Sequence, residues 1–308
     1  MLKLDGIASF VAIAEAGSIN AAARRLNLSK SVVSERLAEL EKGLGASLFH
    51  RSTRRLSLTE DGSAFLEKAV RIVREVEEAA AEMAERRGKL TGPMRISAPV
   101  TFGRMHLGPA LYPFLARHPA ISLTLELDDR RVDATAGGFD AVVRHGVLED
   151  SRLVAWQLAR SQRLLVASPA YLSRHGMPRS LDELAAHRAI YYLNRGVAEW
   201  RFLDAGEGGF ARPAAALRIN NGDMMRDAAL AGLGLAMLPS FIVGQDLKEG
   251  TLVALDVGTI VEPEAIYVAH PEGRRASAKL RALVSSLRDA FGDPPYWEVT
   301  APDGTVDA

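Results

Sequence analysis

Near the start of the chain, two short helical patterns are separated by a very small joint, and this feature constrains the fold more than any other. In AAARRLNLSKSVVSERLAELE, residues 21–41, an alanine- and arginine-rich helix gives way at Asn27 to a turn, after which helical spacing resumes. Ser18 can cap the first helix and Ser29 the second. The first helix would bury Ile19, Ala22, Ala23 and Leu26. The pair is either an αα-hairpin that fills a core or a device that presents its second helix to a partner.

The second helix has two unlike faces. Its inner face carries Val33, Leu37, Leu40 and Leu44. The opposite face carries short or polar residues that do not build a core, namely Lys30, Ser31, Ser34 and Glu35. A recognition helix needs this division, because it enters the major groove of DNA while its other face stays buried. We therefore predict a helix-turn-helix rather than a plain αα-hairpin.

A basic hairpin follows the helix pair. The stretch LFHRSTRRLSLT predicts two short strands around a turn, with His50, Arg51, Arg54 and Arg55 available for phosphates or a narrow minor groove. Residues 20–60 contain eight Lys or Arg against four Glu, so the local charge is 8 − 4 = +4. The whole chain is neutral, with 38 basic and 38 acidic residues, so a nucleic-acid site has to be local. A merely solvated turn is the alternative.

Thr59 can cap a long helix that begins with Glu60 and Asp61. Its apolar residues recur in alternating steps of three and four, at Leu66, Ala69, Val73, Val76, Ala80 and Met83. This spacing makes a narrow seam that requires a partner helix. A second copy of the chain is the favoured partner, and the chain's own globular body is the alternative.

Beyond residue 93, strands alternate with helices. Strands are predicted at residues 95–100, 121–127, 140–146, 163–169, 189–193 and 265–270, and helices at 104–117, 180–187, 223–231 and 278–291. This alternation predicts an α/β fold with right-handed crossovers. Roughly 215 residues is generous for one small sheet, so we expect two α/β lobes.

Composition limits the location and the chemistry. The N-terminal residues imitate a secretory signal, but Asp5 stands where such a signal is basic, and no run reaches the ~18 apolar residues of a membrane span. The chain has no cysteine, which excludes disulfides, thiolate zinc sites and a cysteine nucleophile. We expect a cytoplasmic protein that does not enter a membrane.

In these segments the chain resembles the LysR-type transcriptional regulators. The resemblance rests on residues 10–62, the seam helix, RISAPVTFG, FDAVVRHG, LLVASPAYLSRHG, NNGDMMRDAALAGLGLAMLP and the final helix. It implies a winged helix-turn-helix at residues 1–59, a linker and dimerisation helix at 60–90, and an effector-binding domain at 91–308. That domain would resemble periplasmic binding proteins, with lobe I at about 91–161 and 268–308 and lobe II at about 162–267. The implied assembly is a homodimer or homotetramer.

The predicted DNA contacts follow from these motifs. They are Ser18, Ser29, Lys30, Ser31, Ser34, Glu35, Arg36, Arg51, Thr53, Arg54 and Arg55. One departs from the family, in which a basic residue often follows the serine at position 34. Here Glu35 either accepts a hydrogen bond from a cytosine amino group or pairs with a neighbouring arginine, and the pairing is favoured.

The predicted effector site lies where strands end. Ser97, Pro99, Val100, Thr101 and Phe102 form a strand-to-helix turn whose N–H groups and hydroxyl suit an anion, unless the turn is only structural. Arg144 and His145 close another strand, and a surface salt bridge is their alternative role. Asn221 and Asp223 open a helix of the other lobe, with a plain turn as the alternative. Of Tyr191 and Tyr192 we expect one in the core and one at the site, and we select Tyr191.

The sequence contains none of the common phosphate-loop, nucleophile-elbow or zinc-protease motifs, so we expect no enzyme, no cofactor and no metal. A solute-binding protein is the rival from another class, because the α/β lobes alone would fit it. The DNA module favours a transcriptional regulator. Its expected partners are double-stranded operator DNA and a small-molecule effector, anionic if the predicted turn binds it, with RNA polymerase as a further candidate.

Overall fold

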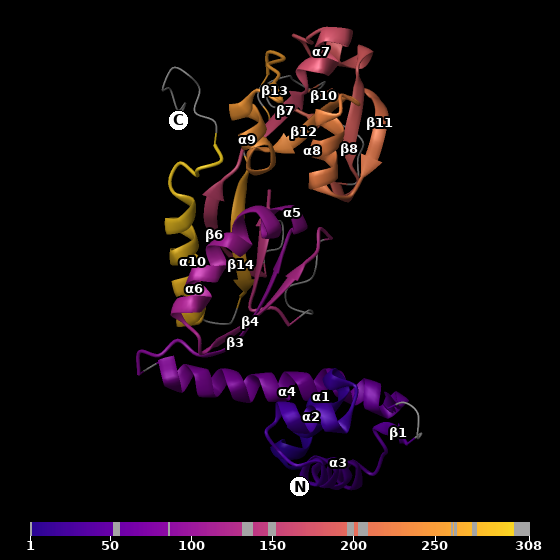
Figure 1. Cartoon of the computed structure of the whole chain (residues 1–308), viewed down its shortest axis with the longest axis vertical. Coiled ribbons are helices and arrows are strands. Elements are labelled where there is room, and N and C mark those ends of the chain that lie inside the picture. Colours follow the sequence, from indigo (N-terminus) through magenta and orange to yellow (C-terminus); the bar gives the residue numbers. More distant parts are fainter. Residues whose placement is uncertain are drawn as a thin grey trace. The chain divides into compact units, whose positions relative to one another are not determined.

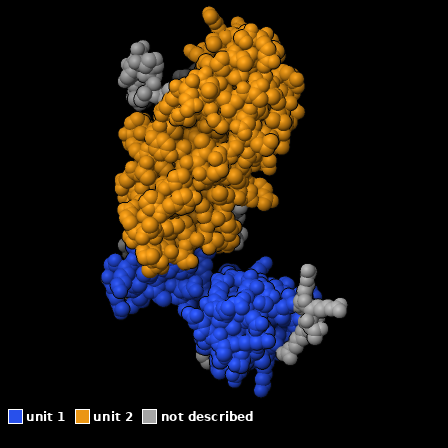
Figure 2. Space-filling model, viewed as in Figure 1, with its two compact units in different colours: residues 1–93 blue, residues 94–308 orange. Residues whose placement is uncertain are grey.

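The computed structural model describes residues 2–51, 56–85, 87–130, 138–146, 152–195, 200–202, 209–259, 261, 264–272 and 276–298. The chain divides into two compact units, Met1–Pro93 and Met94–Ala308, which are coloured separately in Figure 2. Each unit has its own core.

The first unit begins with three helices and a hairpin. The helices are α1 (Leu4–Ala16), α2 (Ile19–Arg25) and α3 (Lys30–Leu44). The hairpin strands β1 (Phe49–Arg51) and β2 (Leu56–Leu58) are antiparallel, and α4 (Glu60–Glu85) follows. This order is a winged helix-turn-helix followed by a long linker helix, as predicted.

Local hydrogen bonds set the helix boundaries in this unit. The Ser18 hydroxyl accepts from the N–H of Ala21 at 3.2 Å, and the Ser29 hydroxyl accepts from the N–H of Val32 at 3.3 Å, so both predicted N-caps are confirmed. Between α2 and α3, Asn27 has a φ of 53°, a left-handed conformation that asparagine tolerates better than most residues. The joint between Arg25 and Lys30 is therefore only four residues long.

The core of the first unit closes around Phe10, Val33, Leu37 and Leu40, which are all buried. Thr59 also acts as the predicted cap, because its hydroxyl accepts from the N–H of Gly62 at 2.9 Å. A Cβ at Gly62 would lie 2.0 Å from the carbonyl oxygen of Leu48, so α4 starts in direct contact with the segment before the hairpin.

The second unit contains two mixed five-stranded sheets (Figure 1). The lobe I sheet has the order β4 (Ile121–Leu127), β3 (Gly92–Ala98), β5 (Ala141–His145), β14 (Ala265–Pro271) and β6 (Leu153–Arg160). After β3 the chain is helical through α5 (Val100–Phe102), the π-helix η1 (Gly103–Leu107) and α6 (Gly108–Arg117). Helix α10 (Ala278–Phe291) lies beside α6.

The lobe II sheet has the order β11 (Ala214–Ile219), β8 (Arg188–Tyr192), β12 (Leu235–Pro239), β7 (Arg163–Ala167) and β13 (Val253–Ala254). Its helices are α7 (Pro169–His175), α8 (Gly222–Leu230) and α9 (Ser240–Glu249). Two short 3-10 helices, η2 (Asp182–Ala186) and η3 (Leu193–Arg195), and the small hairpin of β9 (Trp200–Arg201) and β10 (Phe210–Ala211) complete it.

The chain passes between the two sheets twice, from β6 to β7 and from β13 to β14. The two-lobed α/β fold is thus as predicted, with β14 starting at Ala265, slightly before the predicted return at residue 268. The helix predicted at residues 180–187 is only the 3-10 turn η2, although the expected bond from the N–H of Glu183 to the Ser180 hydroxyl forms at 3.4 Å.

None of the described helices is by itself long and apolar enough to cross a membrane. Helices α1 and α2 pass that test only when taken together, and they are bent by 117° at their break.

Candidate functional sites

The first candidate site is the exposed face of α3. Lys30, Ser31 and Glu35 are exposed and Ser34 is half-buried, while Val33 and Leu37 on the same helix are buried. The hydroxyls of Ser29 and Ser31 lie 2.9 Å apart at the start of the helix. The predicted division of this helix into a buried and an exposed polar face is therefore present in the folded unit.

The favoured role of Glu35, pairing with a neighbouring arginine, is corrected by the structure. The guanidinium of Arg36 pairs instead with Asp5 of α1 at 2.9 Å. Glu35 is exposed and lies near Lys3, whose pKa is raised mainly by its hydrogen bond to Glu39 and further by the charge of Glu35. Arg36 thus ties α3 to α1, whereas Glu35 stays on the exposed face.

The second candidate DNA-binding site is the hairpin of β1 and β2, whose turn is basic in sequence. His50 faces Ser57 and Arg51 faces Leu56 in the antiparallel register. Thr53, Arg54 and Arg55 lie outside the described residues, as does the side chain of Arg51. Their assignment to DNA stays a prediction.

The seam of α4 has two different parts. Leu66 and Val73 pack against the core of the first unit, and Ala69 belongs to that core. Farther along the helix, Val76 is 44% exposed and Met83 54% exposed. The second half of the seam is therefore an uncovered apolar stripe in the single chain.

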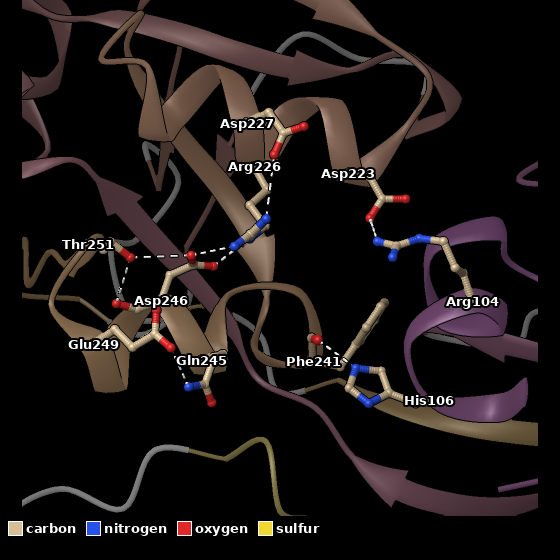
Figure 3. Close-up of polar contacts among 10 residues, drawn as sticks. All are labelled: Arg104, His106, Asp223, Arg226, Asp227, Phe241, Gln245, Asp246, Glu249 and Thr251. Atoms are coloured by element: carbon tan, nitrogen blue, oxygen red, sulfur yellow. Dashed lines mark hydrogen bonds and ion pairs between the residues drawn. The ribbon is translucent and has the colours of Figure 1, made fainter. Parts of the chain in front are cut away.

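The third candidate site is the place where the lobes meet at the start of α5 and α8, which we call the interlobe junction (Thr101, Arg104, Asp129, Asn194 and Asp223). The Thr101 hydroxyl donates to one carboxylate oxygen of Asp223 at 3.1 Å, and the Arg104 guanidinium donates to the other at 2.5 Å. Figure 3 shows Arg104 and Asp223 reaching toward one another from the two lobes. The predicted residues Thr101 and Asp223, 122 positions apart, are brought together.

Helix α8 supplies Asp223 in a defined position. The side chain of the predicted residue Asn221 caps this helix by accepting from the N–H of Met224 at 3.0 Å. Asp223 is therefore in the first turn, where the helix dipole favours a negative charge. Asn221 has a structural role here, and the carboxylate beside it makes the contact across the junction.

A second carboxylate occupies the turn before α5. The N–H of the predicted residue Val100 donates to Asp129 at 2.9 Å, and Asn194 of lobe II donates to the backbone oxygen of Asp129 at 3.2 Å. Burial raises the pKa of Asp129, and the neighbouring charges of Asp128 and Asp223 raise it further. The adjacent Asp128 differs, because its hydrogen bonds to Arg130 lower its pKa to about 2.

Arg144 and Ser97 also meet, as predicted for residues at neighbouring strand ends. The guanidinium of Arg144 donates to the Ser97 hydroxyl at 3.3 Å and to the carbonyl of Val143 at 2.7 Å. Its charge lowers the pKa of both Asp128 and Asp129, so it contributes positive potential beside the junction.

Three predicted effector residues lie elsewhere. Tyr191 is in the lobe II core, where its hydroxyl donates to the carbonyl of Pro213 at 2.8 Å, and the half-buried Tyr192 is the tyrosine beside Asn194. Phe102 is buried edge-on against Phe241. These placements correct the predictions for Tyr191 and Phe102, whose rings fill cores.

His145 is the third correction. It lies at the crossing between the lobes, where its Nδ1 is 3.1 Å from Glu264 and its Nε2 is 3.1 Å from the Ser161 hydroxyl. Arg163 pairs with the same carboxylate at 2.9 Å. His145 thus belongs to a buried polar network rather than to the junction with Thr101.

Sequence reasoning missed Arg104 and Asp129. Arg104 follows Thr101 by three residues, which places both on one face of a helix, and this spacing was the available indication. Asp129 follows the predicted strand at residues 121–127, and strand ends in α/β folds commonly carry site residues.

Comparison with known proteins identifies both units. Residues 4–63 match the model of the bacterial regulatory helix-turn-helix protein, lysR family, and residues 87–292 match that of the LysR substrate binding domain. An HTH-type transcriptional repressor of Pseudomonas aeruginosa is 31% identical, over 97% of this chain and 96% of its own.

Two solved structures are similar along most of the chain. CrgA, a LysR-type transcriptional regulator from Neisseria meningitidis, is 30% identical with a TM-score of 0.58, covering 92% of this chain and 98% of that one. The Vibrio cholerae virulence activator AphB, a member of the LTTR protein family, is 25% identical with a TM-score of 0.57 and the same coverage. The protein belongs to the LysR family of DNA-binding transcriptional regulators.

Proposed function

We propose that paired winged modules of this protein read a pseudo-palindromic operator in the cytoplasm, and that an effector bound at the interlobe junction alters their placement. The observation that supports operator reading is the exposed polar face at the N-terminus of α3, whose opposite face is buried in the core of the first unit. Lys30, Ser31 and Ser34 contact base edges in this proposal. RNA polymerase is a further proposed partner, and we assign no catalytic role.

The remaining contacts position the module on the DNA backbone. Arg51, Thr53, Arg54 and Arg55 of the wing meet phosphates or the minor groove, because a basic hairpin beside a recognition helix supplies charge without reading sequence. Ser18 and Ser29 stand at helix starts, where backbone N–H groups favour phosphate oxygens. Glu35 contributes to base choice, since its carboxylate can accept from a cytosine amino group.

Operator affinity measured at several salt concentrations separates these two roles. Arg54→Ala should weaken binding to all sequences and flatten the salt dependence, because each neutralised phosphate contributes about −0.9 to the slope of log K against log salt. Lys30→Ala should instead change the bases recovered when sites are selected from random DNA. Lys42→Ala is the matched control, because Lys42 lies in the last turn of the same helix. If Arg54→Ala alters neither affinity nor slope, the wing assignment fails.

We further propose that copies of the chain associate through the uncovered stripe of α4, as a homodimer or a homotetramer. The spacing of Val76, Ala80 and Met83 suits a partner helix of the same kind, and Val76 and Met83 are uncovered in the single chain.

The effector is in this proposal a small anion. Its support is the donor set at the junction, namely the Thr101 hydroxyl and the Arg104 guanidinium, with the charge of Arg144 nearby. A thermal-shift screen of metabolites linked to neighbouring divergent genes identifies it. If the saturating effector leaves operator affinity, footprint and transcription unchanged, the coupling is abandoned.

The solute-binding alternative makes a different prediction. A protein that only binds a solute would not shift the mobility of promoter DNA. The family match over residues 4–63 and the exposed polar face of α3 support DNA binding.

A further inference from the structure

The donors that would hold an anion at the interlobe junction already hold an anion of the protein itself. The carboxylate of Asp223 receives hydrogen bonds from Thr101 and Arg104, one on each oxygen. Thr101 is only 3% exposed, so its hydroxyl has little access to water as a substitute partner. An external carboxylate that bound the same two donors would have to replace Asp223.

The backbone is shaped for this contact. Gly222 precedes Asp223, and a Cβ at Gly222 would lie 3.1 Å from the Thr101 hydroxyl oxygen and 2.7 Å from the end of the Ile242 side chain. The absence of a side chain at Gly222 lets the start of α8 approach lobe I closely enough for Asp223 to reach its donors.

The charges around the contact resist a further anion while Asp223 is in place. Asp129 already accepts a hydrogen bond from the N–H of Val100. The charge of Asp223 contributes to the raised pKa of Asp129, so these two carboxylates repel one another. Adding a third carboxylate would increase this repulsion. Exchange of one carboxylate for another leaves the local charge unchanged.

We propose that Asp223 is a built-in ligand of the interlobe junction, occupying the position of an anionic effector, which binds by displacing it. This inference rests on the proposed function for the identity of the site. Asp223 therefore sets specificity, because only an anion that competes with a tethered carboxylate for Thr101 and Arg104 binds there. Displacement also breaks a contact between the lobes, so binding is coupled to their separation at this point.

Chemical rescue tests the proposal with acetate as the probe, since acetate reproduces the side-chain head group of aspartate. Asp223→Ala removes that group and leaves its donors in place. Unfolding of the full chain is followed by tryptophan fluorescence, because Trp156, Trp200 and Trp297 all lie in the second unit. Acetate, compared with chloride at equal ionic strength, should raise the melting temperature of Asp223→Ala by about 3 °C at ten times its dissociation constant, and further with the logarithm of its concentration.

Matched variants define the site of the effect. Asp227→Ala removes a carboxylate from the same helix, one that contacts Arg226 outside the junction, and should respond to acetate no more than the wild type does. In Asp223→Asn the amide fills the space, so acetate should not stabilise this variant. Adding Arg104→Ala to Asp223→Ala should abolish the rescue.

The proposal is overturned if acetate stabilises the wild type and Asp223→Ala equally, or if it stabilises neither. It is also overturned if rescue persists without Arg104. Should Asp223→Ala fail to fold, Asp223→Ser takes its place, because serine suits the first turn of a helix and its short side chain also leaves the carboxylate position open. Absence of acetate binding to that variant in titration calorimetry overturns the proposal. None of these measurements uses DNA, so they can fail while operator regulation stands, or succeed when regulation fails.

Discussion

His106 is a buried histidine whose tautomer follows from its partners. Its Nε2 lies 2.8 Å from the carbonyl oxygen of Phe241, which can only accept, so Nε2 carries the proton. Its Nδ1 therefore accepts from the Tyr296 hydroxyl at 2.6 Å. Burial lowers the pKa of His106, and the charge of Arg104 lowers it further. This neutral ring joins α5–α6 of lobe I to α9 of lobe II.

This environment predicts a loss of stability in mild acid. The unfolded chain takes up a proton near the ordinary pKa of 6.5, whereas the folded chain resists protonation until a lower pH. The contribution of neutral His106 to the free energy of unfolding is therefore complete above pH 6.5, and it is lost as the pH drops toward the lowered pKa. His187, whose pKa is also lowered by burial, adds to the same slope.

His106→Gln isolates the contribution of His106. Urea unfolding followed by tryptophan fluorescence at pH 7.5 and 5.5 should show a smaller pH effect for the variant than for the wild type, because the amide can donate to Phe241 but does not titrate here. His118→Gln is the control, since the half-buried His118 packs against Phe114 and lies outside this contact between the lobes. Equal pH effects in all three proteins would contradict the prediction.

At the scale of elements, the start of α4 depends on close backbone contact. In Gly62→Ala the new Cβ would lie 2.0 Å from a backbone oxygen, so either α4 or the segment at Leu48 must move. We expect a loss of about 2 kcal/mol or more, since overpacking costs roughly that and a carbonyl cannot rotate aside. Urea unfolding followed by circular dichroism measures it.

Gly43→Ala is the control for that substitution. Its Cβ would meet only the end of the exposed Leu2 side chain at 3.0 Å, and alanine improves helix propensity by roughly 1 kcal/mol. It should therefore be neutral or stabilising. Equal losses in both variants would show that the glycine at position 62 serves no special contact.

The exposed half of the α4 seam predicts a dissociating variant. Val76→Asp puts a charge on a stripe that a second copy would bury, and it removes little from the unit's own core, because Val76 is 44% exposed. Analytical ultracentrifugation should show smaller species with an unchanged circular dichroism spectrum. Val70→Asp makes the same change at an exposed residue beside the seam and should sediment like the wild type. If Val76→Asp also sediments like the wild type, the exposed stripe of α4 is not a subunit interface.

The helices of the first unit, each with one buried and one exposed face, were predictable from the sequence. The capped helices at Ser18 and Ser29 and the seam of α4 have a periodic pattern because one face meets water. Strand β12 was missed because all five of its residues are buried, so no alternation marks it. For the same reason the sequence did not show that Tyr191 belongs to the core. Its ring packs inside lobe II, and its hydroxyl donates a hydrogen bond there.

At the scale of the whole molecule, the candidate site depends on contacts that no local pattern contains. Thr101 and Asp223 were each selected from the ends of their own elements, yet the hydrogen bond between them spans 122 positions. It forms because the chain crosses twice between two sheets and so brings the starts of α5 and α8 together. Both residues were predicted from the sequence as parts of the site, but the hydrogen bond between them was not.

If effector and operator bind one coupled system, their effects on each other must be equal. An effector that changes operator affinity by a given factor requires operator DNA to change effector affinity by the same factor, typically about 5- to 150-fold. Titration calorimetry of the screened effector, with and without saturating operator, gives one factor, and fluorescence anisotropy of labelled operator gives the other. Asp227→Ala should preserve both factors, since it leaves Thr101 and Arg104 with Asp223. A factor of one in both titrations would contradict the coupling, because effector and operator would then bind independently. Unequal factors would show only that one titration was not at equilibrium, since reciprocity holds for any mechanism.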